Sequence, residues 1–256
     1  MDEHPIALDV KNLSKRYGSS TESPDSLKDI SFEIPLGKIC CLLGPNGSGK
    51  TTLLKIMAGL LEPTTGTILI HGLDPQKRPL ETRASMGWMP AEERSGLYGR
   101  LTGRENLKFF GSLYGVTSSE MDRVIGNLGL QIGIQEELDK PVLKISSGAK
   151  QKIGLARALL HNPPILLLDE PLRNLDPHTV VRFRRLLKDH LTRGQKKTVL
   201  LSTHQLEEAK RIADLVIFLQ NGRMIKTITS KEWDKELKGQ SMEEFYLKTV
   251  VSETEE

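Results

Sequence analysis

One nine-residue segment, GPNGSGKTT at positions 44–52, constrains this chain more than any other feature. It satisfies the pattern G-x-x-x-x-G-K-S/T through Gly44, Gly49, Lys50 and Thr51. The short apolar run before it, residues 39–43, predicts a buried strand, and apolar residues recur at helical spacing after it. The segment is therefore expected to form a loop between a strand and a helix, which is the context that the pattern requires.

The residue types of this loop suit a phosphate group. Glycines let backbone N–H groups close around phosphate oxygens, and the following helix adds the positive end of its dipole. Lys50 is expected to reach the β- and γ-phosphates of a nucleotide, and the Thr51 hydroxyl to bind Mg²⁺. The loop residues expected to hold the nucleotide are Gly44, Pro45, Asn46, Gly47, Ser48, Gly49, Lys50, Thr51 and Thr52.

A second candidate segment is an apolar strand, residues 165–168, that ends in two carboxylates. Ligands bind at the carboxyl edge of a parallel sheet, so Asp169 and Glu170 are expected to lie at the nucleotide site. Asp169 suits hydrated Mg²⁺, and Glu170, one residue further on, suits the role of general base toward the attacking water.

The remaining pattern predicts an α/β protein. Short strands are expected at 6–10, 30–34, 67–70, 86–89, 165–168, 198–202 and 215–219, and the turn Gln220–Arg223 predicts a hairpin. Residues 100–160 are expected to be helical, with Thr102 capping one helix, Ser118 opening a second and a third beginning near Ser147. The pattern indicates a parallel-sheet core into which helices are inserted.

Composition excludes several other classes of protein. The 256 residues can build one substantial core, and 36 Lys and Arg against 33 Asp and Glu give a net charge of +3, too small to indicate nucleic-acid binding. The only cysteines, Cys40 and Cys41, are adjacent and are expected on opposite faces of one strand, so they form no disulfide framework. The N-terminus shows no secretory signal, and the apolar runs are too short to span a bilayer.

Five further segments resemble those of an ATP-binding cassette (ABC) ATPase, in the order that this family uses. The match runs from about residue 6 to residue 247. The segments are Val10–Gly18 with Tyr17, Leu101–Leu107, Ile145–Ala149 followed by residues to Leu159, Pro171–Pro177 with Asp176, and Ser202–His204.

The resemblance implies a fold and further site residues. It implies a P-loop NTPase core with a mostly parallel sheet, an antiparallel β subdomain at the N-terminal side and an inserted helical subdomain at about 95–160, all within residues 1–230, followed by a short helical tail at 231–256. It implies that Tyr17 stacks on adenine and that His204 is the catalytic switch histidine. Ser146 and Gly148 would face the γ-phosphate of ATP bound to a second cassette, with Asp176 in the loop between the cassettes.

The sequence departs from the family pattern at several positions. Ser147 and Ala149 replace a glycine and a polar residue of the signature segment, and the dimer loop reads Leu172-Arg173-Asn174 where small residues are commoner. The glutamine expected after the 86–89 strand is absent; its place falls on Ala91 or on Glu93, and we favour Glu93, with Glu92 next.

The resemblance is nearest to exporters of drugs, lipids or polysaccharides. It implies an ATPase subunit that works with transmembrane permease subunits at the inner face of the cell membrane, without contact to nucleic acid. Because Lys50, Thr51, Asp169, Glu170 and His204 are all present, we expect a homodimer with two equivalent sites for ATP and Mg²⁺. Two alternatives stay open: a soluble cassette ATPase that acts on nucleic acid, the ribosome or cofactor assembly, and an importer subunit.

Overall fold

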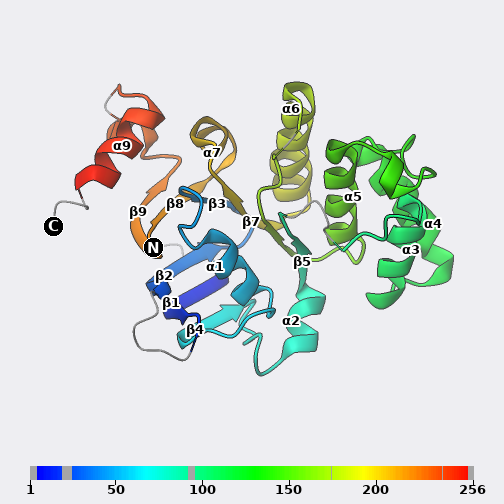
Figure 1. The fold of residues 1–256 in the computed structure, drawn as a ribbon, viewed down its shortest axis with the longest axis horizontal. Helices are drawn as coiled ribbons and strands as arrows, with labels where there is room; N and C mark the ends of the chain where they lie inside the picture. The colour runs from blue at the N-terminus through cyan, green and yellow to red at the C-terminus, as the bar shows by residue number, and fades with distance from the viewer. Residues whose placement is uncertain (1–4, 19–24, 92–95, 174, 238, 253–256) are drawn as a thin grey trace.

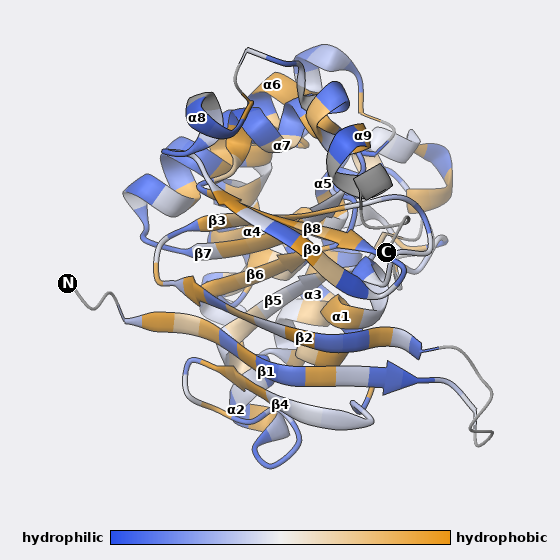
Figure 2. Cartoon of the chain, turned by 90° about the vertical axis from the view of Figure 1, so that its left-hand side faces the viewer, coloured by the Kyte–Doolittle hydropathy of each residue, from blue (hydrophilic) through white to orange (hydrophobic). Residues whose placement is uncertain are grey.

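The computed structural model describes residues 5–18, 25–91, 96–173, 175–237 and 239–252. Two β-sheets lie one above the other, and helices cover the larger sheet (Figures 1 and 2). The predicted α/β class, with a mostly parallel sheet and a separate antiparallel sheet, is confirmed.

The larger sheet has the strand order β5-β6-β7-β3-β8-β9. All neighbouring strands are parallel except β8 and β9, which form the predicted hairpin. Its turn residues Asn221 and Gly222 have φ of 47° and 76°, the left-handed values of a tight hairpin turn. The strands are β3 (Ile39–Leu43), β5 (Met86–Met89), β6 (Ile165–Leu168), β7 (Thr198–Thr203), β8 (Leu215–Gln220) and β9 (Arg223–Thr229).

The smaller sheet is antiparallel in the order β2-β1-β4, with β1 at Ile6–Arg16, β2 at Asp25–Pro35 and β4 at Thr65–Ile70. The first two strands are longer than the sequence predicts. Register irregularities interrupt the pairing of β1 with β2, and Asn12 has a φ of 49°. Such bulges break the alternation of apolar and polar residues, so the polar half of each strand carries no clear strand pattern.

The helices follow the predicted order. Thr102 forms a capping box with Glu105: its hydroxyl accepts from the Glu105 N–H at 3.1 Å, and the Glu105 carboxylate accepts from the Thr102 N–H at 2.8 Å. Helix α2 was not predicted, because Thr82 is its only buried residue and it shows no apolar periodicity. The helices are α1 (Lys50–Met57), α2 (Pro79–Ser85), α3 (Gly103–Leu113), α4 (Ser118–Ile132), η1 (Val142–Lys144, 3₁₀), α5 (Ser147–Leu159), α6 (Pro177–Arg185), η2 (Leu186–Gly194, π), α7 (Leu206–Ile212), α8 (Trp233–Leu237) and α9 (Met242–Ser252).

Strand β3 separates two hydrophobic cores. Cys40 packs into the core that β1, β2, β4 and α1 share, whereas Cys41 packs into the core below the helices that cover the opposite face, as the alternation along a strand predicts. Both thiols are fully buried, and burial raises the pKa of each. Much of the strands of the larger sheet is hydrophobic (Figure 2), and their buried residues are divided between the two cores.

The sheet order brings three segments to one edge. Strands β6, β7 and β3 are parallel neighbours, so the residues that follow each of them meet at the same edge of the sheet. The phosphate-loop pattern follows β3, the two carboxylates follow β6, and His204 follows β7. None of the described helices combines the length and apolar character that crossing a membrane requires.

A glycine in β5 tests how closely α5 packs on the sheet. A Cβ at Gly87 would lie 2.0 Å from the backbone oxygen of Ala158 in α5, so Gly87→Ala must move the helix or the strand. We expect this variant to lower the free energy of unfolding by about 1–3 kcal/mol, as overpacking does. Gly126 is the matched control: no atom lies within 4 Å of its added Cβ, and alanine inside α4 is expected to stabilise by about 0.5–1 kcal/mol. Urea denaturation of both variants measures the difference, and equal stability would contradict close packing at Gly87.

Candidate nucleotide site

The phosphate-loop backbone is fixed by close approaches at its glycines. A Cβ at Gly44 would lie 2.1 Å from the Leu219 backbone oxygen. Gly49 has a φ of 102°, and its Cβ would lie 2.6 Å from the Leu27 side chain. The helix α1 begins at the next residue without a side-chain cap, so the N–H groups of its first turn are available to an anion.

Lys50 folds back over this loop. Its ammonium donates to the backbone oxygens of Gly44, at 2.7 Å, and Pro45, at 3.0 Å. Lys50 is 6% exposed, and this burial lowers its pKa. The negative charges of Glu170 and Asp169 raise the pKa and offset part of that effect. The amine is thus held at the loop by neutral carbonyl oxygens, which a phosphate group can outcompete because it is charged.

A chain of hydrogen bonds joins the three strand ends. The Thr51 hydroxyl donates to one oxygen of Asp169 at 2.8 Å, and the Ser202 hydroxyl donates to the other at 2.5 Å. Ser202 also accepts from the Glu170 N–H at 2.8 Å. Thr51, Asp169 and Glu170, which the sequence predicts to act at one site, therefore lie together.

Glu170 is held in an uncommon backbone conformation. Its φ is 48°, in the left-handed region, which costs a residue with a side chain about 1–2 kcal/mol. Its N–H bonds to Ser202, and its carbonyl accepts from the Gln151 side chain at 3.0 Å. Its carboxylate contacts the ring of His204, with Nδ1 at 3.0 Å from Oε2 and 3.2 Å from Oε1.

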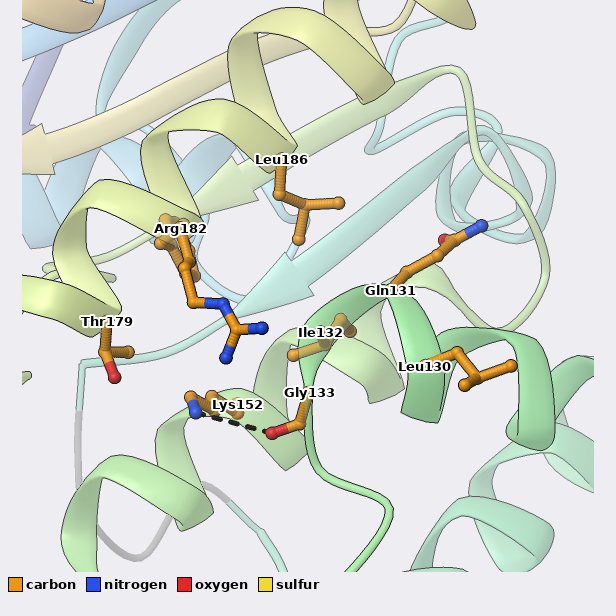
Figure 3. A pocket seen from close by; sticks show the side chains of 9 residues that line it. Leu130, Gln131, Ile132, Gly133, Lys152, Thr179, Arg182 and Leu186 are labelled. Atoms are coloured by element: carbon orange, nitrogen blue, oxygen red, sulfur yellow. Dashed lines mark hydrogen bonds between the residues drawn. The ribbon is translucent and has the colours of Figure 1, made fainter.

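The cleft beside the loop has two adjoining parts. The first, about 280 Å³, is lined by Ser26, Asn46, Gly47, Ser48, Gly49, Lys50, Thr51, Thr52, Ala91, Glu170 and Arg173. The second, about 350 Å³, is lined by Asn46, Glu170, Arg173, His204 and Gln205. Either part exceeds the pocket of about 40 Å³ between α4, α5 and α6, which Figure 3 shows and which has room for only a few water molecules.

The donor set at Thr51 and Asp169 fits Mg²⁺. Both side chains offer oxygen atoms, which this ion prefers, and the two oxygens already lie within 2.8 Å of each other. No group of three or more His, Cys, Asp or Glu side chains with metal-binding geometry occurs in the described ranges. A site with so few protein ligands suits Mg²⁺, which usually takes one or two carboxylates and completes its shell with phosphate oxygens and water.

Tyr17 lies beside the first turn of α1. Its side chain is 50% exposed, and its hydroxyl lies 3.3 Å from that of Thr52 in α1. The Lys15 ammonium lies 5.6 Å from the ring centroid. An exposed ring next to the helix that carries the phosphate loop is available for stacking.

The other predicted ligand residues do not line this cleft. Ser146 caps α5 by accepting from the Ala149 N–H at 3.2 Å, and it is exposed. Asp176 caps α6 by accepting from the Thr179 N–H at 3.0 Å, and hydrogen bonds from the Thr179 side chain and backbone lower the pKa of Asp176. Gly148, in the first turn of α5, is partly buried and is also absent from the lining of both parts.

Of the three positions considered for the missing glutamine, the structure describes only Ala91. Ala91 lines the cleft next to the phosphate loop. Glu92 and Glu93 lie outside the described residues, so the preference for Glu93 stays a prediction.

Comparison with known families agrees with this geometry. The family model for ABC transporters matches residues 27–173, which is more than half of the chain and includes the phosphate loop and both carboxylates. The chain belongs to the ABC transporter family. The family that the sequence motifs suggested is thus confirmed.

Relatives of similar length show the same likeness over nearly the whole cassette. The ABC transporter ATP-binding protein NatA of Bacillus subtilis is 36% identical over 85% of this chain and 87% of its own. The lantibiotic transport ATP-binding protein SrtF of Streptococcus pyogenes is 33% identical over 96% of this chain and 98% of its own.

Solved structures of cassettes share the fold. An ATP-binding subunit of an ABC transporter superimposes with a TM-score of 0.83 and 31% identity, over 95% of this chain and 99% of that one. The bacterial ABC transporter cassette MJ0796, solved as a dimer, gives a TM-score of 0.79 and 28% identity over 87% of this chain and 98% of that one. The same cassette bound to ADP and Pi gives a TM-score of 0.76 and 25% identity, over 87% and 98% of the two chains.

Two residues of the cassette site were missed by sequence reasoning. Ser202 stands two positions before His204, and nothing in its local pattern indicates that it bonds to the Asp169 carboxylate and the Glu170 N–H, which follow a neighbouring strand. Gln151 precedes Glu170 by 19 positions. It belongs to α5, and its contact with Glu170 depends on how that helix packs. Both contacts depend on the strand order and helix packing, so no sequence signal finds them.

Ser202 offers a direct test of the hydrogen-bond chain. Ser202→Ala leaves an oxygen of Asp169 and the Glu170 N–H without this buried partner, so we expect the free energy of unfolding to fall by about 1–3 kcal/mol. Ser112→Ala is the matched control, because among the described residues that exposed hydroxyl bonds only to the Lys108 carbonyl of its own helix, and a change within about 0.5 kcal/mol is expected. Denaturant titration measures both; equal effects would mean that Ser202 contributes no more than a surface serine.

Proposed function

We propose that this cassette is the Mg²⁺-dependent ATP-hydrolysing subunit of an ABC exporter, and that it acts as a dimer on a separate transmembrane permease. The observation that carries the proposal is the chain Thr51–Asp169–Ser202–Glu170–His204 at the ends of three neighbouring strands. It combines an oxygen pair for Mg²⁺ with a carboxylate that a histidine orients, next to a phosphate loop.

Each residue has a distinct role in the proposed hydrolysis. Thr51 and Asp169 hold Mg²⁺, which neutralises charge on the phosphate oxygens when it is bound. Lys50 and the loop N–H groups hold the β- and γ-phosphates. Glu170 accepts the proton of the attacking water, and His204 fixes the orientation of that carboxylate. Tyr17 stacks on the adenine ring.

Replacing the proposed base tests this assignment. Glu170→Gln keeps the size and the contact with His204 but cannot accept a proton, so ATP hydrolysis should slow by about 10²–10⁴-fold while ATP binding persists. Phosphate release and equilibrium nucleotide binding measure the two effects. Glu207→Gln is the control, because that exposed carboxylate lies on α7 outside the cleft lining. A Glu170→Gln protein with wild-type turnover would contradict the role of base.

The exposed start of α5 supports a dimer in which each ATP is shared. Ser146 and Gly148 lie outside the cleft of their own chain, and the first turn of α5 offers N–H groups to an anion from another molecule. The solved relative MJ0796 is a dimer. We infer two equivalent sites in a homodimer, with Asp176 and its loop between the two cassettes.

Dimerisation is tested in the hydrolysis-deficient protein. ATP and Mg²⁺ should convert Glu170→Gln protein from monomer to dimer in light scattering, and adding Ser146→Arg should block this by filling the γ-phosphate seat. Ser119→Arg, at the exposed start of α4, is the control and should dimerise normally. Loss of the Ser146 cap costs only about 1 kcal/mol, so the variant is expected to fold. If ATP produces dimers only when a different cassette chain is added, the inferred homodimer is wrong and the cassette works as a heterodimer.

The direction of transport rests on the relatives. SrtF is named for lantibiotic transport and the protein of Rhizobium meliloti, 36% identical over 86% of this chain, for Nod factor export. We propose export for this cassette on that basis, at the inner face of the cell membrane. We also propose that residues 1–230 form the cassette and residues 231–256 a short tail. Glu93 is proposed to take the place of the missing glutamine between the nucleotide and the permease.

A further inference from the structure

Arg173 occupies a position of the cleft that the proposed mechanism leaves unused. Among the described residues, three line both parts of the cleft: Asn46 of the phosphate loop, Glu170 and Arg173. Arg173 is thus at the junction between the phosphate loop and the pair formed by Glu170 and His204. A γ-phosphate bound by the loop and attacked by a water at Glu170 must lie at this same junction.

The backbone around Arg173 is firmly held. Its N–H donates to the Glu170 carbonyl at 3.1 Å, which closes a turn directly after the proposed base. The preceding Leu172 is 3% exposed and belongs to the main core, so it anchors the turn. Arg173 itself is exposed. The chain therefore presents a long cationic side chain from a fixed point three residues after Glu170.

The charges around Arg173 favour a phosphate as its partner. Within the described part of the chain, its guanidinium has no hydrogen bond and no ion pair, even though the Glu170 carboxylate lines the same cleft. The Lys50 ammonium bonds to two neutral carbonyl oxygens of the loop. A guanidinium stays charged at every physiological pH and binds phosphate oxygens through paired N–H groups.

We propose that Arg173 contacts the γ-phosphate of ATP bound in the cleft of its own chain and makes this cassette prefer ATP over ADP. The inference rests on the proposed function and adds a ligand residue to that site. ADP lacks the group that Arg173 contacts, so the contribution of Arg173 is confined to ATP.

Nucleotide affinities measure this contribution directly. All variants carry Glu170→Gln to prevent hydrolysis, and binding of ATP and of ADP, each with Mg²⁺, is measured at protein concentrations where light scattering shows monomers. Arg173→Ala should weaken ATP binding by about 10- to 100-fold, the value of a hydrogen bond to a charged group, and change ADP binding by no more than about twofold. Arg173→Lys should recover part of the loss, because it keeps the charge and loses the paired N–H geometry. Arg185→Ala, at an exposed arginine of α6, should change neither affinity.

The alternative outcomes are distinct. Unchanged ATP affinity, or an equal loss for ATP and ADP, would overturn the γ-phosphate contact. A loss that occurs only at concentrations where ATP forms dimers would also overturn it, since Arg173 would then act on the nucleotide of the second copy. Failure of the Glu170→Gln parent to bind either nucleotide would contradict the proposed function itself, and this inference with it.

Discussion

The hydrogen bond between the Thr51 hydroxyl and the Asp169 carboxylate joins residues that are 118 positions apart in the chain. It exists only because β6, β7 and β3 are parallel neighbours, so that the phosphate loop and the acidic pair leave the sheet at one edge. Ser202, at the end of the strand between them, completes the connection from the other side of Asp169. A buried carboxylate without these two hydroxyl partners would be costly, and with them its two oxygens are fixed in direction.

The same network stabilises the unusual backbone of Glu170. A left-handed φ at a residue with a side chain is unfavourable by itself, and two side chains from different elements bind the peptide groups on either side of it. One of them, Gln151, belongs to the helix whose first turn carries Ser146. One hydrogen bond therefore links the loop that carries Glu170 to α5, the helix that Ser146 caps.

Local signals in the sequence were sufficient for much of the fold. The capping box at Thr102, the turn at Asn221-Gly222 and the strand Met86–Met89 depend on residues within a few positions of one another, and each is present where predicted. The local sequence pattern did not predict the full length of β1 and β2, and it did not predict α2. The bulged halves of β1 and β2 lack alternation, and α2 has too few buried residues to show helical periodicity.

For the site, the sequence by itself determined the chemistry: a glycine-rich loop with a lysine and a threonine, and two carboxylates after an apolar strand, indicate a phosphate and a divalent cation whatever surrounds them. Only the tertiary structure decided which residues share the site. It brought in Ser202, Gln151 and Arg173, and it left Ser146 and Asp176 outside the cleft as caps of their own helices. The physical reason is that short-range pattern fixes backbone conformation and residue type, whereas contacts between strand ends and helices depend on the order of strands in the sheet and on which helix packs on which face.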